Sequence, residues 1–141
     1  LGLGFLGLQW RGILRLDEKG TEALRAQLAG AQAMLPSTDR EHRWFRALAI
    51  TAGFCEEVAC RGFLIWYFAA WTGHWAAAVA GAIVFGLGHF YQGTSGILKT
   101  GVAGLIAGLL FVGTGSLLWP MLLHAAVDLQ GGAVGRRLLK G

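Results

Sequence analysis

The sequence is poor in charge, in cysteine and in proline, and these shortages exclude several classes of protein. Charged residues make up 14% of the chain, against about 25% in an ordinary soluble domain, while hydrophobic residues make up 55%. A disordered chain is excluded, because it would need much more charge and much less apolar material. Two cysteines cannot form the dense disulfide framework of a small secreted domain. The composition therefore indicates a membrane protein.

The few charges gather outside one long apolar region. Seven of the 12 basic residues lie in 11–46 and three in 136–140. The charged residues between 47 and 135 are Glu56, Glu57, Arg61, Lys99 and Asp128. This distribution is typical of a chain embedded in hydrocarbon and does not form a phosphate-binding face. We therefore expect the lipid bilayer as a partner and no nucleic acid.

The apolar runs predict an all-α, multi-pass transmembrane bundle with about four spanning helices. These runs cover about 47–71, 75–91, 97–112 and 117–134. Short loops that contain Gly, Thr or Ser separate them, and the first run is long enough to cross the hydrocarbon core. Residues 1–10 are also apolar but too few to span. Because no Met precedes Leu1, we interpret 1–10 as the tail of a truncated earlier span.

The polar segment 11–38 predicts an amphipathic helix on the membrane surface. Its apolar residues Leu24, Leu28, Ala31 and Leu35 recur at helical spacing, as expected of a helix with one apolar stripe. Pro36 then ends this helix. Thr38 is followed three residues later by Glu41, which is the capping-box pattern at the start of a helix.

Charge also predicts the domain layout and the orientation. We expect an intramembrane core at 39–135 and a basic tail at 136–141. If the four spans alternate, the 11–46 segment and the tail lie on the same side as Lys99. The positive-inside rule assigns that side to the cytoplasm. We therefore predict a multi-pass protein of the plasma (inner) membrane.

Ionisable side chains inside the spans require an explanation, because placing each one near the bilayer centre costs about 2.5–3.5 kcal/mol in insertion free energy. Glu57 and Arg61 are four residues apart, so they share a helix face and are predicted to pair. Two further pairs have the same spacing, Phe85 with His89 and His124 with Asp128. Counting the helical rise from the loops, these stripes and Glu56 converge in the cytoplasmic half of the bundle.

Several kinds of chemistry fit this set poorly. The sequence has neither the His-Glu-x-x-His motif of a zincin nor the Glu-x-x-His repeats of a di-iron bundle. The two cysteines lack metal-ligand spacing, and we predict that both are apolar core residues. A zinc site made of one Glu and two His remains open. The other option is a Glu and a His that activate water directly, with a second His stabilising the oxyanion. That option needs no metal and no cofactor.

Three short motifs resemble those of one family. Glu56-Glu57-Val58-Ala59-Cys60-Arg61 is similar to its Glu-Glu-x-x-x-Arg motif, Phe85 to His89 to Phe-x-x-x-His, and His124 to Asp128 to His-x-x-x-Asn/Asp. The family is the CAAX protease and bacteriocin-processing family, also called CPBP or Abi. The resemblance covers about 45–132 and implies an intramembrane glutamate protease that works without a metal. Its substrate would be a peptide or a membrane protein.

The resemblance also implies a role for each site residue. Glu56 and His89 would activate the water, and His124 with Asp128 would stabilise the oxyanion. Glu57 and Arg61 would orient the site, with Phe85 as a further supporting residue. Many members carry Asn at the position of Asp128, and an ionised Asp would repel an oxyanion. Asp128 would therefore be protonated or would orient His124 as a hydrogen-bond acceptor.

Two other functions remain open at this point. Some members of the family resemble bacteriocin-immunity proteins, so the alternative is a non-proteolytic immunity or membrane scaffold protein of the same fold. A transporter that relays ions or protons through Glu56 and Asp128 is a third possibility. The absence of paired repeats argues against the transporter.

Overall fold

The computed structural model describes residues 17–28, 32 and 34–140, together with positions 4, 7, 11, 12 and 15. Its elements are α2 (Glu18–Leu28), α3 (Asp39–Glu57), a π turn (Val58–Leu64), α4 (Ile65–Thr72), α5 (His74–Gly88), a 3-10 turn (Phe90–Gln92), α6 (Gly93–Thr114) and α7 (Leu118–Lys140). No strand occurs among the described residues, so the all-α prediction is confirmed. The span tail expected at 1–10 lies mostly outside these residues.

The first long helical segment begins at the predicted cap. The Thr38 hydroxyl accepts a hydrogen bond from the backbone N–H of Glu41, and the Glu41 carboxylate accepts one from the backbone N–H of Thr38, both at 3.2 Å. This reciprocal pair satisfies backbone donors that the first helical turn leaves unpaired. The helix then continues through α3, the π turn and α4 as far as Gly73, whose φ of 78° is readily adopted only by glycine.

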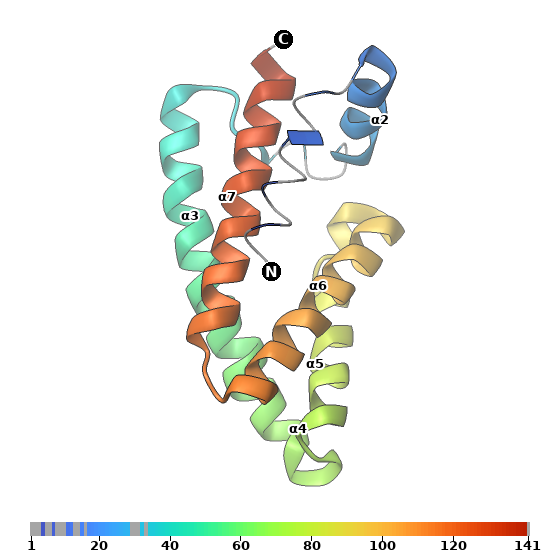
Figure 1. The fold of residues 1–141 in the computed structure, drawn as a ribbon, viewed down its shortest axis with the longest axis vertical. Coiled ribbons are helices and arrows are strands. Elements are labelled where there is room, and N and C mark those ends of the chain that lie inside the picture. The colour runs from blue at the N-terminus through green and yellow to red at the C-terminus, as the bar shows by residue number, and fades with distance from the viewer. Residues whose placement is uncertain are drawn as a thin grey trace.

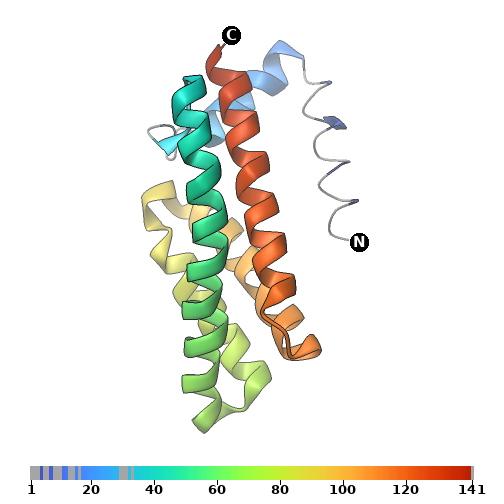
Figure 2. The same cartoon turned by 90° about the vertical axis from the view of Figure 1, so that its left-hand side faces the viewer.

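The helices form two antiparallel pairs (Figure 1). α3 runs beside α7 along most of its length, as the view turned by 90° also shows (Figure 2). α5 packs against α6, and α4 packs against α5 at the lower end of the molecule in Figure 1. α2 lies near the C-terminal end of α7, where the Arg25 guanidinium donates to the Leu138 carbonyl at 2.9 Å.

Small residues allow these helices to approach closely. A Cβ at Gly86 would lie 2.8 Å from the Ile97 carbonyl oxygen, across the contact between α5 and α6. A Cβ at Gly53 would lie 2.9 Å from the backbone nitrogen of Ala125, across the contact between α3 and α7. Both distances are far below van der Waals contact, so only glycine fits without a shift of one backbone. Small residues at helix contacts are the usual means of packing in membranes.

The prediction of four spanning helices is not confirmed. Within the described residues, one helical stretch, Phe90–Thr114, is long and apolar enough to cross a membrane. α5 is equally apolar but has only 15 residues. α7 extends through Lys140, beyond the predicted end near 134, and its polar residues lower its hydropathy. In the first run, charged residues in the first turns of α3 lower the hydropathy, and the π turn interrupts the α-helix.

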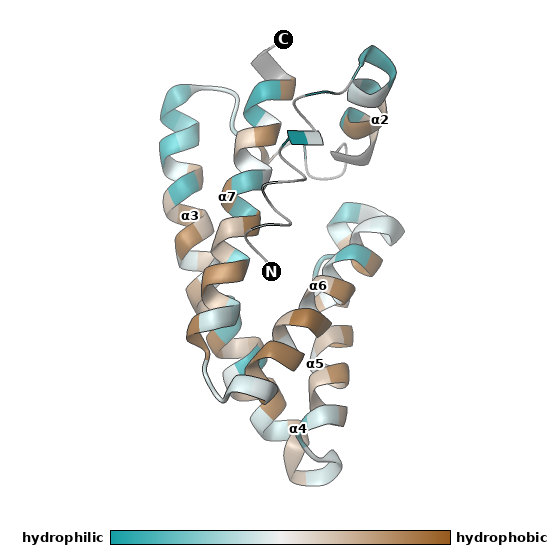
Figure 3. Cartoon of the chain, in the orientation of Figure 1, coloured by the Kyte–Doolittle hydropathy of each residue, from teal (hydrophilic) through white to brown (hydrophobic). Residues whose placement is uncertain are grey.

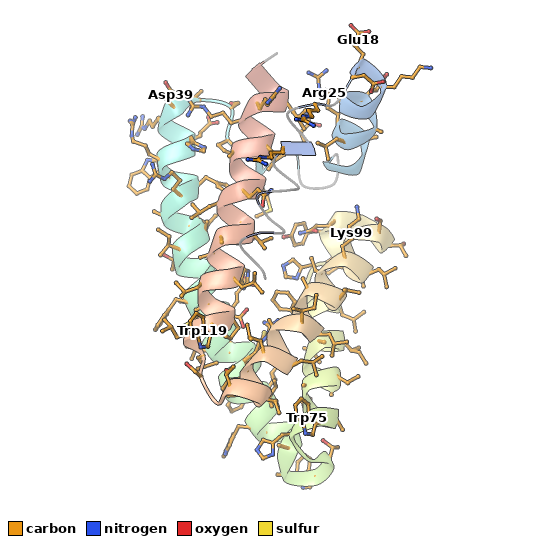
Figure 4. The ribbon with its side chains drawn as sticks, in the orientation of Figure 1. Glu18, Arg25, Asp39, Trp75, Lys99 and Trp119 are labelled. Atoms are coloured by element: carbon orange, nitrogen blue, oxygen red, sulfur yellow. The ribbon has the colours of Figure 1, made fainter. Side chains whose placement is uncertain are left out.

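Hydropathy divides the molecule along its long axis. The start of α3, the end of α7 and α2 are hydrophilic and lie at the same end, while the rest is mainly hydrophobic (Figure 3). Trp75 and Trp119 lie in the other half, far from Asp39 and Glu18 (Figure 4). Large apolar side chains are exposed along the outside, with the exposed tryptophans including Trp44, Trp66, Trp71, Trp75 and Trp119. An outer surface of this kind is rare in soluble proteins and suits contact with lipid.

The cysteine prediction is wrong for Cys55. This side chain is exposed and Cys60 is only half-buried. Neither is among the buried hydrophobic residues of the described part of the chain, which include the cluster of Ile65, Ala77 and Ala78. Cys55 lies on the outward face of α3 instead, in the same way as the exposed Phe54 beside it. An apolar side chain can face outward there because the surrounding medium is lipid, so apolar character does not predict burial.

Candidate active site

The site begins where α3 changes into the π turn. Glu56 and Glu57 are the last residues of α3, and Arg61 lies in the π turn that follows. A π turn adds a residue to the helical repeat and changes the direction of the side chains that follow it. Such turns occur frequently at functional sites. Here the turn lies between the two glutamates and the aromatic helix α4.

Glu57 is the centre of a buried polar network. Its Oε1 atom lies 3.0 Å from Nη1 of Arg61 and 2.7 Å from Nδ1 of His124. The side chains of Glu57 and Arg61 are 1% and 3% exposed, so their charges are screened little by solvent. The predicted pair of Glu57 with Arg61 is confirmed. The bond from α3 to His124 on α7 also ties together two helices that are distant in sequence.

Arg61 has two further partners that fix its position. Its Nη2 atom donates to the Gly104 carbonyl on α6 at 3.0 Å, and its guanidinium lies 4.5 Å from the centre of the Phe85 ring. A Cβ at Gly104 would lie 2.9 Å from the Phe85 ring, so glycine is needed there. A planar guanidinium can make the ion pair, the carbonyl bond and the ring contact together. Arg61 therefore connects the π turn to both α5 and α6.

The other ring nitrogen of His124 faces a more open region. Its Nε2 atom lies 3.8 Å from Oε2 of Glu56 and 3.6 Å from Oδ2 of Asp128. The side chains of Glu56 and Asp128 are 41% and 34% exposed. These distances are longer than hydrogen bonds. The carboxylates of Glu56 and Asp128 therefore both lie near Nε2 of His124 without forming a hydrogen bond to it.

His89 follows the last residue of α5 and is held by backbone and aromatic contacts. Its Nδ1 atom lies 2.8 Å from the Phe85 carbonyl oxygen. A carbonyl oxygen only accepts, so Nδ1 carries the hydrogen and the lone pair of a neutral ring is on Nε2. The His89 ring lies 4.6 Å from the Phe85 ring and 5.8 Å from the Tyr91 ring, between centroids.

Phe85 joins the two histidines. Its ring lies edge-on to His124 at 5.8 Å and contacts His89, which follows the end of α5. Asp128 joins the group through its Oδ2 atom, which lies 3.6 Å from Nε2 of His124. The structure therefore brings all seven predicted site residues together: Glu56, Glu57, Arg61, Phe85, His89, His124 and Asp128. The convergence predicted from their spacing is confirmed, whereas their catalytic roles stay a prediction.

Sequence reasoning missed three parts of this site. The Gly104 carbonyl accepts from Arg61, although the glycine itself signals only close packing. Tyr91 lies beside His89 and accepts a hydrogen bond from Gln92 at 3.0 Å; its position two residues after a motif histidine was the available signal. The π turn left no signal in the residue pattern. Among the residues that the structure describes, no three His, Cys, Asp or Glu side chains are grouped closely enough to hold a metal ion.

The sequence was compared with known families. The model of the family described as Type II CAAX prenyl endopeptidase Rce1-like matches residues 41–130, which is well over half of the chain. The chain belongs to the Rce1-like family. The family resemblance read from the three motifs is thereby confirmed. Membership makes the chain a membrane-embedded protein of a protease family whose substrate is a peptide in a membrane. No curated protein and no solved structure matches the chain.

All three motifs fall within the matched Rce1-like region. It extends from Glu41, at the capping box, to Gln130, two residues after Asp128. It therefore includes α3 from its third residue, the π turn, α4, α5, α6 and the first half of α7. α2 and the end of α7 lie outside the match, and both lie at the hydrophilic end of the molecule (Figure 3).

Proposed function

We propose that this Rce1-like protein hydrolyses peptide bonds inside the membrane by a glutamate-type mechanism that requires no metal. The observation that carries the proposal is the unequal environment of the two adjacent glutamates. Glu57 is buried and committed to Arg61 and His124, whereas Glu56 is partly exposed and directed toward the open side of His124. In this proposal the Glu57 carboxylate stabilises the contact between the helices, and the Glu56 carboxylate is available for catalysis.

Glu56 and His89 are the proposed bases for the attacking water. A carboxylate and a neutral imidazole can each accept a proton from a bound water molecule. The contact of His89 Nδ1 with the Phe85 carbonyl supports this role, because it leaves Nε2 as the acceptor. The proton taken from water would then pass to the leaving amine, as general acid–base catalysis requires.

His124 is the proposed donor to the oxyanion. The ionised Glu57 carboxylate beside Arg61 accepts a hydrogen bond from Nδ1, so this nitrogen carries a hydrogen. Donation from Nε2 then requires the imidazolium form, whose charge Glu56 and Asp128 would balance. A fixed donor aimed at developing negative charge stabilises the transition state. In this scheme Asp128 acts on His124 and does not itself contact the oxyanion.

We also propose that 39–135 is the functional core and that the basic end of α3 and α7 faces the cytoplasm of the plasma (inner) membrane. The clustering of arginines at that end supports the orientation through the positive-inside rule. Cysteine substitutions at Ser37 and at Thr114, in a protein whose own cysteines are replaced, should react with an impermeant thiol reagent from opposite sides of the membrane. Labelling of both positions from the same side would contradict the proposed orientation.

The proposed activity is tested with the protein in liposomes and a library of peptides, with and without a chelator. Glu56→Gln and His89→Ala should each reduce cleavage by about 10²- to 10⁴-fold without changing the thermal unfolding curve. Glu18→Gln, on the distant helix α2, serves as the matched control and should cleave normally. Undiminished cleavage by Glu56→Gln would contradict the mechanism. Loss of activity with the chelator would favour the zinc site. A wild-type protein that binds peptides and cleaves none would favour the immunity or scaffold function.

A further inference from the structure

Tyr91 belongs to a short turn that directly follows His89. The backbone N–H of Gln92, the last residue of the 3-10 turn, donates to the His89 carbonyl at 3.0 Å. Gly93 follows the turn with a φ of 75°, a value that glycine adopts readily. The hydrogen-bonded turn therefore gives the backbone of Tyr91 a defined place beside His89.

The side chain of Gln92 holds the Tyr91 hydroxyl group. Its Nε2 atom donates to this hydroxyl at 3.0 Å. The first atoms of the Gln92 side chain rest against Gly96, one helical turn further along the chain. A Cβ at Gly96 would lie only 2.2 Å from the Cβ of Gln92, so only glycine fits there while Gln92 keeps its position. The turn and the start of α6 thus fix both ends of the tyrosine.

The imidazole ring of His89 contacts two aromatic rings. Phe85 lies 4.6 Å away and Tyr91 lies 5.8 Å away, between ring centroids, which are ordinary distances for aromatic pairs. The contact of His89 Nδ1 with the Phe85 carbonyl fixes one edge of the imidazole but leaves its plane free to turn about that bond. The neighbouring rings restrict this rotation and thereby the direction of Nε2.

We propose that Tyr91 is a positioning residue for His89. The proposal rests on the proposed function, in which Nε2 of His89 accepts a proton from the attacking water. Gln92 holds the tyrosine hydroxyl, the tyrosine ring restricts the imidazole, and Nε2 keeps its direction. A general base must stay within hydrogen-bond reach of the proton that it accepts, and supporting side chains that are themselves held provide this precision. Tyr91 lies outside the three motifs and needs no contact with the substrate.

The second tyrosine of the chain offers a matched control. Tyr67 and Tyr91 are both 43% exposed, and an exposed tyrosine can also serve only as an anchor at the membrane surface. The ring of Tyr67 contacts other aromatic rings on the same side of the π turn and α4, which belong to Phe63, Phe68 and Trp71. None of these is a site residue. A positioning effect should therefore be specific to Tyr91, whereas an anchoring effect should be common to both tyrosines.

The orientation of the His89 ring is tested by NMR on protein in lipid nanodiscs with ¹³C-labelled histidine rings. The chain contains four histidines, and the spectrum of His89→Ala identifies the signal of His89. In Tyr91→Leu this signal should broaden, because the imidazole samples several orientations, while the signal of His74 stays unchanged. Tyr91→Phe keeps the ring and should broaden the signal much less. Tyr67→Leu should leave the His89 signal as it is in the wild-type protein.

Peptide cleavage tests the consequence for the reaction. Tyr91→Leu should lower kcat by about tenfold to a hundredfold, the size expected for a misplaced catalytic group. KM should stay nearly unchanged, because the substrate itself does not lose a contact. Tyr91→Phe loses only the hydrogen bond to Gln92 and should keep roughly a fifth or more of the wild-type kcat. Tyr67→Leu should cleave normally.

The proposal is overturned if the His89 signal of a folded Tyr91→Leu protein stays as sharp as in the wild type. It is also overturned by a raised KM with unchanged kcat, which would indicate contact with the substrate, or by equal losses in Tyr91→Leu and Tyr67→Leu, which would indicate anchoring. If Tyr91→Leu does not fold, Gln92→Leu removes the donor to the hydroxyl and should broaden the His89 signal to a smaller extent. The NMR result does not depend on cleavage, so a wild-type protein that cleaves no peptide contradicts the proposed function alone.

Discussion

The two ring nitrogens of His124 have surroundings that differ in distance, in pairing and in exposure to solvent. On the Nδ1 side, Glu57 lies at 2.7 Å and is itself paired with Arg61, and both residues are almost completely buried. On the Nε2 side, Glu56 and Asp128 lie at 3.8 Å and 3.6 Å and are partly exposed. We call these the buried side and the open side. A single imidazole therefore connects a closed network to an accessible region.

The comparison shows how one helix can use two adjacent glutamates differently. Glu56 and Glu57 have the same chemistry, but about 100° of helical rotation separates their directions. That rotation directs one carboxylate toward α7 and Arg61 and the other toward the open region. A buried charge must be paired or it destabilises the fold, so Glu57 is needed for structure. Glu56 is partly exposed and is under no such constraint, which agrees with its proposed role in binding water.

Removing the cation from the buried side should have the largest effect on stability. Arg61→Ala leaves the Glu57 carboxylate buried without its cation, and we expect a loss of about 3–5 kcal/mol in the free energy of unfolding. The unfolding midpoint in detergent, followed by tryptophan fluorescence, measures this loss. Arg137→Ala, an exposed arginine on α7, is the control and should change stability by no more than about 0.5 kcal/mol. Equal stability of the two variants would show that the buried side is not structural.

Separating α3 from α7 should have the next largest effect on stability. Gly53 faces Ala125, the residue after His124, so a side chain there would move α7 away from Glu57. We expect Gly53→Val to cost about 1–3 kcal/mol and to reduce peptide cleavage through displacement of His124. Gly113→Ala, at a position with no atom within 4 Å of the added Cβ, is the matched control and should be neutral or slightly stabilising. A fully active and stable Gly53→Val protein would contradict the close contact.

The open side should tolerate a conservative change. Asp128→Asn keeps an acceptor near His124 and exchanges an ionic contact for a neutral one, which costs about 1 kcal/mol. We expect cleavage to fall about fivefold with no change in the unfolding midpoint. Asp128→Leu removes the acceptor and should lose more activity than Asp128→Asn. Destabilisation by Asp128→Asn comparable to that of Arg61→Ala would remove the distinction between the two sides.

The smallest effect should come from the start of α3, far from both sides. Hydrogen bonds from Ser37, chiefly its backbone N–H, hold the pKa of Glu41 below its usual value. A carboxyl with a lowered pKa in the folded state stabilises the fold above its unfolded pKa, and that stability is lost as the pH falls through the folded pKa. The wild-type protein should therefore lose stability in the acidic range below the ordinary glutamate pKa. Glu41→Gln should show a weaker dependence there in unfolding curves recorded at several pH values.

Much of the site could be predicted from the sequence because it depends on local spacing. The pairing of Glu57 with Arg61, the capping box at Thr38 and the stripe of His124 and Asp128 all follow from the three- and four-residue periodicity of a helix. Convergence of the stripes followed from their similar depth, counted along the helical rise from the loops. The helix order was therefore predicted well, apart from the ends of the helices.

The rest depends on tertiary contacts and on the medium. The bond between Glu57 and His124 joins residues 67 positions apart, and the identity of the buried glutamate depends on which side of α3 meets α7. The π turn at Val58–Leu64 has no residue signature. Cys55 faces outward because the apolar exterior needs no polar cover. The predicted number of spans was a count of apolar runs, and the run at 75–91 forms α5, which has only 15 residues.

The shortness of α5 has a consequence for the lipid around it. A helix of 15 residues is about 22 Å long, whereas the hydrocarbon core of a bilayer is about 30 Å thick. Val79, Ile83 and Leu87 are exposed along α5 and cover only that shorter length. If α5 is one of the spans, the mismatch is met by thinning of the bilayer or by flanking residues that reach the interface, at a fraction of a kcal/mol for each Å. Since His89 follows directly after α5, such thinning would bring the aqueous phase closer to His89 and would shorten the distance over which water must enter.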